Sequence, residues 1–271
     1  MTEPDGWTLT EFQVPDDLAE VVSDLLWAGG VAAVEETQRD GGVVLRTSVD
    51  PSVVSAVLKS HPGVTATETW VSSTVADTWR EHAVPVHVQG DAWLVPAWTD
   101  PLPGARSILI EPFDTFGLGN HPTTVLALRA ALAVAAEGGT VLDVGSGSGV
   151  LSVAMSVLRG CACTATDIAP QARQALEFNA TKNGVAGRIH WVDDLSQVAP
   201  GAYTTVVANI LAPVLRDLAP MLEEACAIGG HIVLSGLRAD QEDGVVACYP
   251  GSRVVSREVS EGWVAVTLAR G

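Results

Sequence analysis

A glycine-rich turn is the feature of this sequence whose spacing most directly predicts chemistry. Residues 140–144 have the pattern of a buried strand, and they are followed by Gly145-Ser146-Gly147-Ser148-Gly149 and an apolar helix start at Val150. Backbone that lacks side chains can approach a ligand closely, and the amides at a helix start favour anionic groups. We therefore expect a cofactor at Gly145 and Gly147; an ordinary tight turn between strand and helix is the alternative.

The spacing of these glycines also indicates which kind of cofactor to expect. The turn reads G-x-G-x-G, whereas the dinucleotide fingerprint requires G-x-G-x-x-G, and Val150 stands where its last glycine would be. The sequence therefore disfavours an NAD-binding fold.

Acidic residues follow two later strand-like segments. Asp167 closes the segment 161–166, and its carboxylate could accept hydrogen bonds from both hydroxyls of a ribose; the alternative is a helix N-cap before Pro170. Asp193 and Asp194 close the segment 189–192, where a carboxylate could accept from an adenine amino group. For Asp194 we predict this adenine contact, with a solvated charge pair as the alternative.

An uncharged amide lies at the end of the next strand-like segment. Asn209 follows residues 206–208, and its carbonyl oxygen could accept a proton from an amine nucleophile. A capping asparagine is the alternative. Upstream, the segment 113–124 contains mobile glycines that suit a lid over a cofactor, and Thr123 or Thr124 could cap the helix that follows.

The elements that must position these residues form a parallel α/β pattern. Five apolar strand segments alternate with helices, and the chain ends in a predicted hairpin over 253–268; the five segments are 141–144, 161–166, 189–192, 206–208 and 232–234. Ligands of such sheets bind at the carboxyl ends of the strands. All the polar residues named above follow strands in this way.

The first 70 residues have a different organisation. Strand and helix periodicities alternate in the order β-α-β-β-α-β, which predicts a small ferredoxin-like α+β domain. We expect this domain over 1–70, a linker with a polar helix at 72–82 and short strands over 71–107, and the α/β domain over 108–271.

Composition restricts the class of protein and its partners. The chain has 271 residues, of which 47% are hydrophobic and 17% charged, so it is globular. Its net charge of −17 disfavours nucleic acid and anionic membranes and favours a cationic partner.

Neither export nor metal binding is predicted. The start of the chain carries no basic segment before an apolar run, and no segment has the pattern of a membrane helix, so we expect a cytoplasmic protein. The four cysteines lack metal-ligand spacing and are expected to be buried free thiols.

Taken together, these motifs resemble the ribosomal protein L11 methyltransferases, the PrmA family. The similarity covers nearly the whole chain and rests on residues 143–149, Asp167, Asn209-Ile210-Leu211 and the loop Gly117-x-Gly119-x-His121-Pro122-Thr123-Thr124. It also includes Trp79 to His82, Val95 to Trp98 and Leu234 to Gly236.

This resemblance implies a class I S-adenosylmethionine-dependent methyltransferase with a mostly parallel, seven-stranded Rossmann-like sheet. It implies cofactor contacts at Thr124, Gly145, Asp167 and Asn209, and a first domain that recognises a basic ribosomal protein whose lysine or N-terminal amines are methylated. Asn209 is the predicted catalytic residue. A methyltransferase for another protein or a small molecule, and more distantly a nucleotide-linked oxidoreductase, remain as alternatives.

Overall fold

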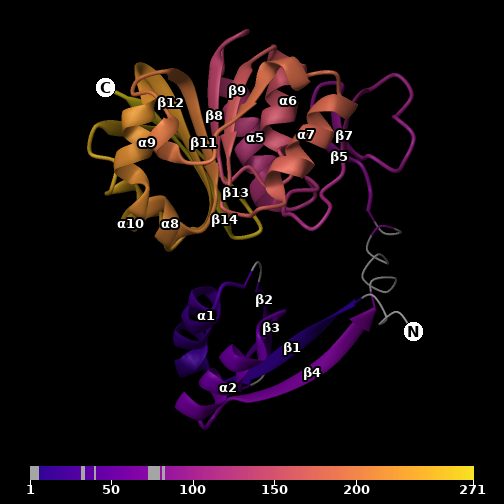
Figure 1. Cartoon of the computed structure of the whole chain (residues 1–271). Helices are drawn as coiled ribbons and strands as arrows, with labels where there is room; N and C mark the ends of the chain where they lie inside the picture. The colour runs from indigo at the N-terminus through magenta and orange to yellow at the C-terminus, as the bar shows by residue number, and fades with distance from the viewer. Residues whose placement is uncertain (1–5, 32–33, 40, 73–79, 81–82) are drawn as a thin grey trace. The chain divides into compact units, whose positions relative to one another are not determined.

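The computed structural model describes residues 6–31, 34–39, 41–72, 80 and 83–271. They belong to two compact units, Met1–Ala83 and Val84–Gly271, which are drawn with their element labels in Figure 1. Each unit has a core of its own and is described by itself.

The first unit has the predicted order of elements. Its elements are β1 (Gly6–Val14), η1 (Asp16–Leu18), α1 (Ala19–Ala28), β2 (Glu35–Arg39), β3 (Gly42–Thr47), α2 (Pro51–Ser60) and β4 (Thr65–Ser72). The strands form an antiparallel sheet in the order β2-β3-β1-β4. Alternate strand residues such as Phe12 and Leu45 are buried against Leu26 of α1 and Val57 of α2. This pairing and burial make the unit ferredoxin-like.

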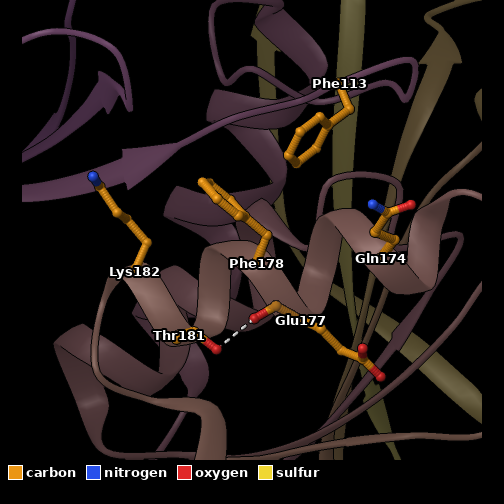
Figure 2. Close-up of a pocket in the computed structure, with 6 residues that line it drawn as sticks. All are labelled: Phe113, Gln174, Glu177, Phe178, Thr181 and Lys182. Carbon is orange, nitrogen blue, oxygen red and sulfur yellow. Dashed lines mark hydrogen bonds between the residues drawn. The ribbon is translucent and has the colours of Figure 1, made fainter.

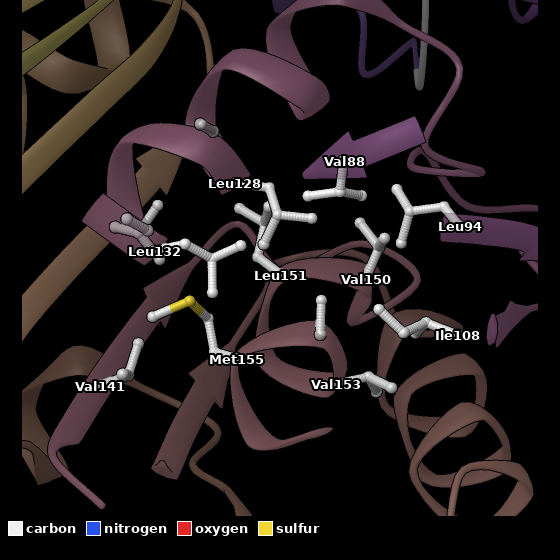
Figure 3. Packing of buried hydrophobic residues seen from close by; sticks show 14 of the residues in the cluster. Val88, Leu94, Ile108, Leu128, Leu132, Val141, Val150, Leu151, Val153 and Met155 are labelled. Atoms are coloured by element: carbon white, nitrogen blue, oxygen red, sulfur yellow. The ribbon is translucent and has the colours of Figure 1, made fainter. Parts of the chain in front are cut away.

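The residues expected to be a linker contribute to the second unit. The strands β5 (Val86–Gln89), β6 (Ala92–Pro96) and β7 (Arg106–Ile110) form a three-stranded sheet. Val88, Leu94 and Ile108 of this sheet belong to the same buried cluster as Leu128 and Val150, as Figure 3 shows. The second unit therefore begins at Val84 rather than at 108, because these short apolar strands cover its helices. The helix expected over 72–82, with Trp79, lies largely outside the described residues.

A seven-stranded sheet organises the second unit. Its order is β10-β9-β8-β11-β12-β14-β13, parallel from β10 to β12 and antiparallel for the last two strands. The strands are β8 (Thr140–Val144), β9 (Ala162–Thr166), β10 (Ile189–Trp191), β11 (Tyr203–Asn209), β12 (Cys226–Arg238), β13 (Ser252–Ser260) and β14 (Trp263–Arg270). The predicted parallel strands and terminal hairpin are confirmed.

Helices cover both faces of this sheet. They are α5 (Pro122–Val134), α6 (Val150–Arg159), α7 (Ala172–Lys182), α8 (Ala212–Asp217), α9 (Ala219–Ala225) and α10 (Glu242–Val246), with short 3-10 turns η2 (Ala186–Arg188) and η3 (Leu195–Gln197). Neighbouring strand residues point to opposite faces: Val141 packs with α5 and α6, whereas Leu142 packs with α8 and α9. Figure 1 shows α5 to α7 on one side of the sheet and α8 to α10 on the other.

Three of the four cysteines are buried, as expected, and the fourth is not. Cys161, Cys163 and Cys226 are buried free thiols, and Cys248 is half-buried. Among the described residues, no helix is both long enough and apolar enough to cross a membrane.

Candidate active site

The glycine turn lies between β8 and α6 and is tightly enclosed. Gly145, Gly147 and Gly149 have φ values of +73°, +53° and +77°, which side chains other than glycine rarely adopt. A Cβ added at these three positions would collide with Ile210, the carbonyl oxygen of Phe116 and Leu176, respectively. At each of the three positions, both the positive φ and the close packing therefore require glycine. An ordinary tight turn does not need this close packing.

Asp167 is connected directly to this turn. Its Oδ2 accepts a hydrogen bond from the Gly147 amide at 2.8 Å, and its Oδ1 accepts one from the Ala169 amide at 2.8 Å. The helix that follows begins at Ala172 with Gln171 as its N-cap. The alternative that Asp167 caps this helix is therefore wrong. The carboxylate instead orients the tip of the glycine turn.

Ile168 is a residue that sequence reasoning missed. Its side chain is fully exposed, at 102% of the reference area, although it directly follows Asp167 at the end of β9. An isolated exposed isoleucine is unremarkable by itself. At the carboxyl edge of the sheet it exposes an apolar side chain next to Asp167 in the chain, and no sequence pattern distinguishes it from a buried isoleucine.

Asp194 has a local structural role in addition to its position after β10. Its Oδ1 accepts from the Ser196 amide at 2.6 Å as the N-cap of η3, and hydrogen bonds from Ser196 lower its pKa. The adjacent Asp193 accepts from the Trp191 indole at 2.7 Å and lies 3.8 Å from the Arg173 guanidinium. Both carboxylates are exposed, so Asp194 keeps lone pairs that face solvent.

Asn209 and Thr124 meet at the end of β11. The Asn209 amide nitrogen donates to the Thr124 hydroxyl at 3.4 Å, and Thr124 is itself buried in α5. This orientation leaves the Asn209 carbonyl oxygen without a hydrogen bond to any described residue. The next helix, α8, has Leu211 as its N-cap, so Asn209 does not cap it. Two residues 85 positions apart, both predicted as site residues, are therefore neighbours.

The start of α5 is organised by His121, not by a threonine. His121 is the N-cap, and its Nδ1 accepts from the Thr123 amide at 3.3 Å and lies 2.7 Å from the Thr123 hydroxyl. The expectation that Thr123 or Thr124 caps this helix is wrong, because the Thr123 amide donates its hydrogen bond to the His121 imidazole. The ring also packs edge-on against Phe116 and Trp263, with centroids 5.4 and 5.3 Å apart.

The protonation of His121 follows from these contacts. Burial lowers its pKa, so the imidazole is neutral near pH 7. Since Nδ1 accepts from the Thr123 amide, the proton of the neutral ring lies on Nε2. His121 is therefore a hydrogen-bond donor at Nε2. Its partner Trp263 lies 142 positions away in the chain, which explains why sequence reasoning did not find this pair.

Asp143 is a second residue to which sequence reasoning assigned no role. It is the penultimate residue of β8 and is completely buried, and its Oδ2 accepts from both the amide and the hydroxyl of Ser152. Its Oδ1 is buried and has no hydrogen-bond partner among the described residues. Burial raises the pKa of Asp143 to about 6. This carboxyl therefore fastens α6, whose N-terminus follows the glycine turn, to the strand that precedes the turn.

A cavity of about 440 Å³ lies beside α7, away from the predicted site residues. Figure 2 shows its lining: Phe113, Gln174, Glu177, Phe178, Thr181 and Lys182. The rings of Phe113 and Phe178 meet edge to face with centroids 5.1 Å apart. It is an open surface depression, whereas the glycine turn, Asp167 and Asn209 occupy the strand ends where α/β folds bind ligands. We therefore place the candidate site at the strand ends.

No metal centre is indicated in the part of the chain that the structure describes. Its His, Cys, Asp and Glu side chains do not gather in groups of three or more that could hold an ion. The polar groups of the candidate site are instead backbone amides, one hydroxyl, one amide side chain and carboxylates.

The strand order, with a glycine turn after β8 and a carboxylate after its neighbour β9, defines the class I methyltransferase fold. The chain belongs to the family of ribosomal protein L11 methyltransferases (PrmA), whose model matches residues 46–271. The family predicted from the sequence motifs is thereby confirmed.

Individual relatives agree with this membership. The chain is 40% identical over 194 residues to the ribosomal protein L11 methyltransferase of Pectobacterium carotovorum, covering 71% of this chain and 66% of that protein. For the Yersinia pestis protein of the same name the identity is 37%, over 70% of this chain and 65% of that protein. The matches thus span just under two thirds of the length of these relatives.

A solved structure shows the same architecture. The crystal structure of a ribosomal protein L11 methylase from Lactobacillus delbrueckii subsp. bulgaricus matches with a TM-score of 0.64 and 29% identity. It covers 69% of this chain and 99% of that one.

Proposed function

We propose that this chain transfers a methyl group from S-adenosylmethionine to lysine or N-terminal amines of a basic large-subunit ribosomal protein of the L11 type. The observation that carries the proposal is the hydrogen bond from the Gly147 amide to Asp167, which joins the glycine turn to a strand-end carboxylate in a chain of this family.

The residues of the strand ends fit this cofactor. The glycine turn presents backbone that no side chain can cover, since a Cβ at Gly145 or Gly147 would collide with its surroundings. Asp167 retains acceptor lone pairs for ribose hydroxyls, and Asp194 could accept from an adenine amino group. Asn209 provides an amide at the end of the neighbouring strand β11, and it is hydrogen-bonded to the Thr124 hydroxyl of α5. When bound, S-adenosylmethionine supplies a methyl group on a sulfonium, which is activated without a metal.

Asn209 is suited to position the accepting amine. A lysine amine has a pKa of about 10.4 in water and is protonated near pH 7, so the reacting nitrogen must lose a proton and be oriented. Because the Asn209 amide nitrogen donates to Thr124, its carbonyl oxygen is directed elsewhere and is available as an acceptor. Asn209 therefore accepts an N–H of the neutral amine and aligns its lone pair.

His121 does not serve as the base for this amine. Its Nδ1 is occupied by the Thr123 amide and its Nε2 carries the proton, so the neutral ring has no free lone pair. We infer that the amine loses its proton to water before it is aligned. The aromatic contacts of His121 with Phe116 and Trp263 instead fix the loop that precedes α5.

Substrate recognition is assigned to the first unit. The glycine turn, Asp167 and Asn209 all belong to the second unit, so none of these predicted cofactor-binding residues lies in the ferredoxin-like unit. A net charge of −17 attracts a basic protein by long-range electrostatics. Both features support a basic ribosomal protein as the substrate.

The nucleotide-linked oxidoreductase is disfavoured by packing as well as by spacing. Val150, which stands where the dinucleotide fingerprint has its last glycine, is 3% exposed and packs in the core cluster with Leu128 and Ile108. A methyltransferase for another protein or a small molecule would use the same cofactor residues. Only identification of the molecule that accepts the methyl group distinguishes it from the proposed function.

The test combines binding with product identification. The protein is titrated with S-adenosylmethionine and with NAD in a calorimeter, and it is then incubated with labelled S-adenosylmethionine and purified ribosomal proteins. We expect binding of S-adenosylmethionine alone and label in one basic large-subunit protein. Binding of NAD in its place would contradict methyl transfer. Cofactor binding without any labelled ribosomal protein would point to the other acceptors.

A further inference from the structure

A buried asparagine joins the glycine turn to the segment that precedes it in the fold. Asn179 of α7 is completely buried, and its amide nitrogen donates to the carbonyl oxygens of Glu111 and Ser148 at 2.8 and 2.9 Å. Its Oδ1 accepts from the Glu111 amide at 2.8 Å. One side chain thus holds the backbone on either side of it, and both donors of its amide group are used.

Ser148 completes a closed ring of hydrogen bonds. Its amide donates to the carbonyl oxygen of Phe116 at 2.9 Å, and its hydroxyl donates to that of Gly117 at 2.6 Å. Both ends of the segment 111–117 are therefore bonded to Ser148, at one end through Asn179. We call these five residues, Glu111, Phe116, Gly117, Ser148 and Asn179, the clasp.

The clasp acts on the part of the turn that faces a ligand. Ser148 lies between Gly147 and Gly149, and the Gly147 amide is held by Asp167 on the other side. A turn built from glycines has little conformational preference of its own, so its shape depends on such external contacts. Among the described residues, no hydrogen bond joins the Asn179 side chain to Gly145, Gly147, Asp167 or Asn209; its partners are Glu111 and Ser148.

We propose that Asn179 is a positioning residue for cofactor binding: it holds Ser148, and through it the glycine turn, in the conformation that receives S-adenosylmethionine. The inference rests on the proposed function. It extends the site to helix α7, which contains none of the predicted cofactor-binding residues.

The same helix provides a matched control. Asn183, one turn further on, accepts from the Leu109 amide at 2.9 Å and donates to the Leu109 carbonyl oxygen at 2.7 Å. Its third hydrogen bond returns to the Asn179 carbonyl oxygen of its own helix. Each asparagine therefore bonds the amide and the carbonyl oxygen of one residue, Leu109 in β7 for Asn183 and Glu111 just after β7 for Asn179, but only Asn179 reaches the glycine turn.

The experiment compares Asn179→Ala with Asn183→Ala in the full chain. S-adenosylhomocysteine binding is measured by calorimetry at a temperature well below the melting point of each variant. Exchange of the Ser148 amide is measured without ligand. We expect Asn179→Ala to raise the Kd on the order of tenfold and to speed the exchange, and Asn183→Ala to change both less than twofold. Equal effects of the two variants, or an unchanged Kd in Asn179→Ala, would overturn the proposal.

A second variant and a measurement that is independent of ligand binding cover two cases in which the first comparison fails. If Asn179→Ala does not fold, Asn179→Ser takes its place, because a serine has a single donor and cannot bond the carbonyl oxygens of both Glu111 and Ser148. The proposal requires a raised Kd in this variant, and an unchanged Kd overturns it. If the parent protein does not bind S-adenosylhomocysteine, the proposed function fails, whereas amide exchange still compares the two asparagine variants and decides whether Asn179 orders the turn.

Discussion

Asp167 combines a structural and a predicted binding role in one carboxylate. Each oxygen accepts one backbone amide, from Gly147 and Ala169, and keeps further acceptor capacity. Asp167→Ala is expected to weaken S-adenosylmethionine binding by about 1.5–3 kcal/mol, because charge-assisted hydrogen bonds are lost. Calorimetry measures the affinity, and Asp193→Ala, which removes an exposed carboxylate one strand away, is the control. An unchanged affinity in a folded Asp167→Ala protein would remove this residue from the site.

Asn209 is expected to act in the transition state more than in cofactor binding. Asn209→Ala should lower kcat on the order of a hundredfold while the Kd for S-adenosylmethionine changes little, since alignment of the amine is realised during transfer. Single-turnover kinetics and calorimetry separate the two quantities. A loss confined to the melting temperature would show that Asn209 only fastens β11 to Thr124.

The buried carboxyl of Asp143 predicts a pH dependence of stability. Its pKa is raised from 3.8 to about 6 in the folded state, so the folded protein binds this proton more tightly than the unfolded chain and its contribution to stability falls as pH rises from about 4 through 6. In Asp143→Asn this dependence is absent. The free energy of unfolding of the variant relative to the parent should therefore rise by about 1.5 kcal/mol between pH 5 and pH 8. Urea unfolding at both values measures it; a difference independent of pH would show that Asp143 keeps its ordinary pKa.

At the scale of elements, the loop between β7 and α5 is more restrained than a free lid. Its carbonyl groups at Phe116 and Gly117 accept from Ser148, and His121 fastens its other end to α5. Any closing motion must therefore be small, or it must break the bonds to Ser148 first. The expected lid is better described as a loop shaped by the glycine turn.

Substitution of the loop glycines tests this description. Gly117 and Gly119 have φ values of +108° and +104°, and an added Cβ would meet the Ser148 hydroxyl and Leu94. Replacing both by Ala is expected to shift the loop, to destabilise it by about 1–2 kcal/mol per site and to reduce both cofactor affinity and turnover. Gly104→Ala, at φ +73° in open space, should cost stability alone. Melting temperature, Kd and kcat are compared, and equal effects of the two changes on Kd would contradict a role of the loop in the site.

At the scale of the whole molecule, the division into two units predicts separable functions. A fragment that begins at Val84 retains the three-stranded sheet and the complete core of the second unit. We expect it to fold and to bind S-adenosylmethionine with the affinity of the full chain, but to lose methylation of the ribosomal protein. Full activity on the protein substrate would show that the first unit does not select it.

The local sequence pattern alone predicts which segments of the second unit form strands and which residues lie at the ends of those strands. Strand periodicity predicted the five parallel strands and the terminal hairpin, and parallel strands place whatever follows them at one edge of the sheet. The glycine turn, Asp167 and Asn209 therefore reach that edge by topology alone, because Gly145 and Asp167 directly follow β8 and β9 and Asn209 is the last residue of β11.

Contacts between distant segments decided the rest, because burial and hydrogen-bond partners are not properties of a local pattern. Whether β5 to β7 form a linker or part of the core depends on α5 and α6, which come later in the chain. The local pattern predicts a threonine as the cap of α5, whereas in the structure the His121 side chain accepts from the Thr123 amide and packs edge-on against Trp263. Asn179 has the sequence context of any polar helix residue, and only the close approach of α7 to Glu111 and Ser148 gives it partners.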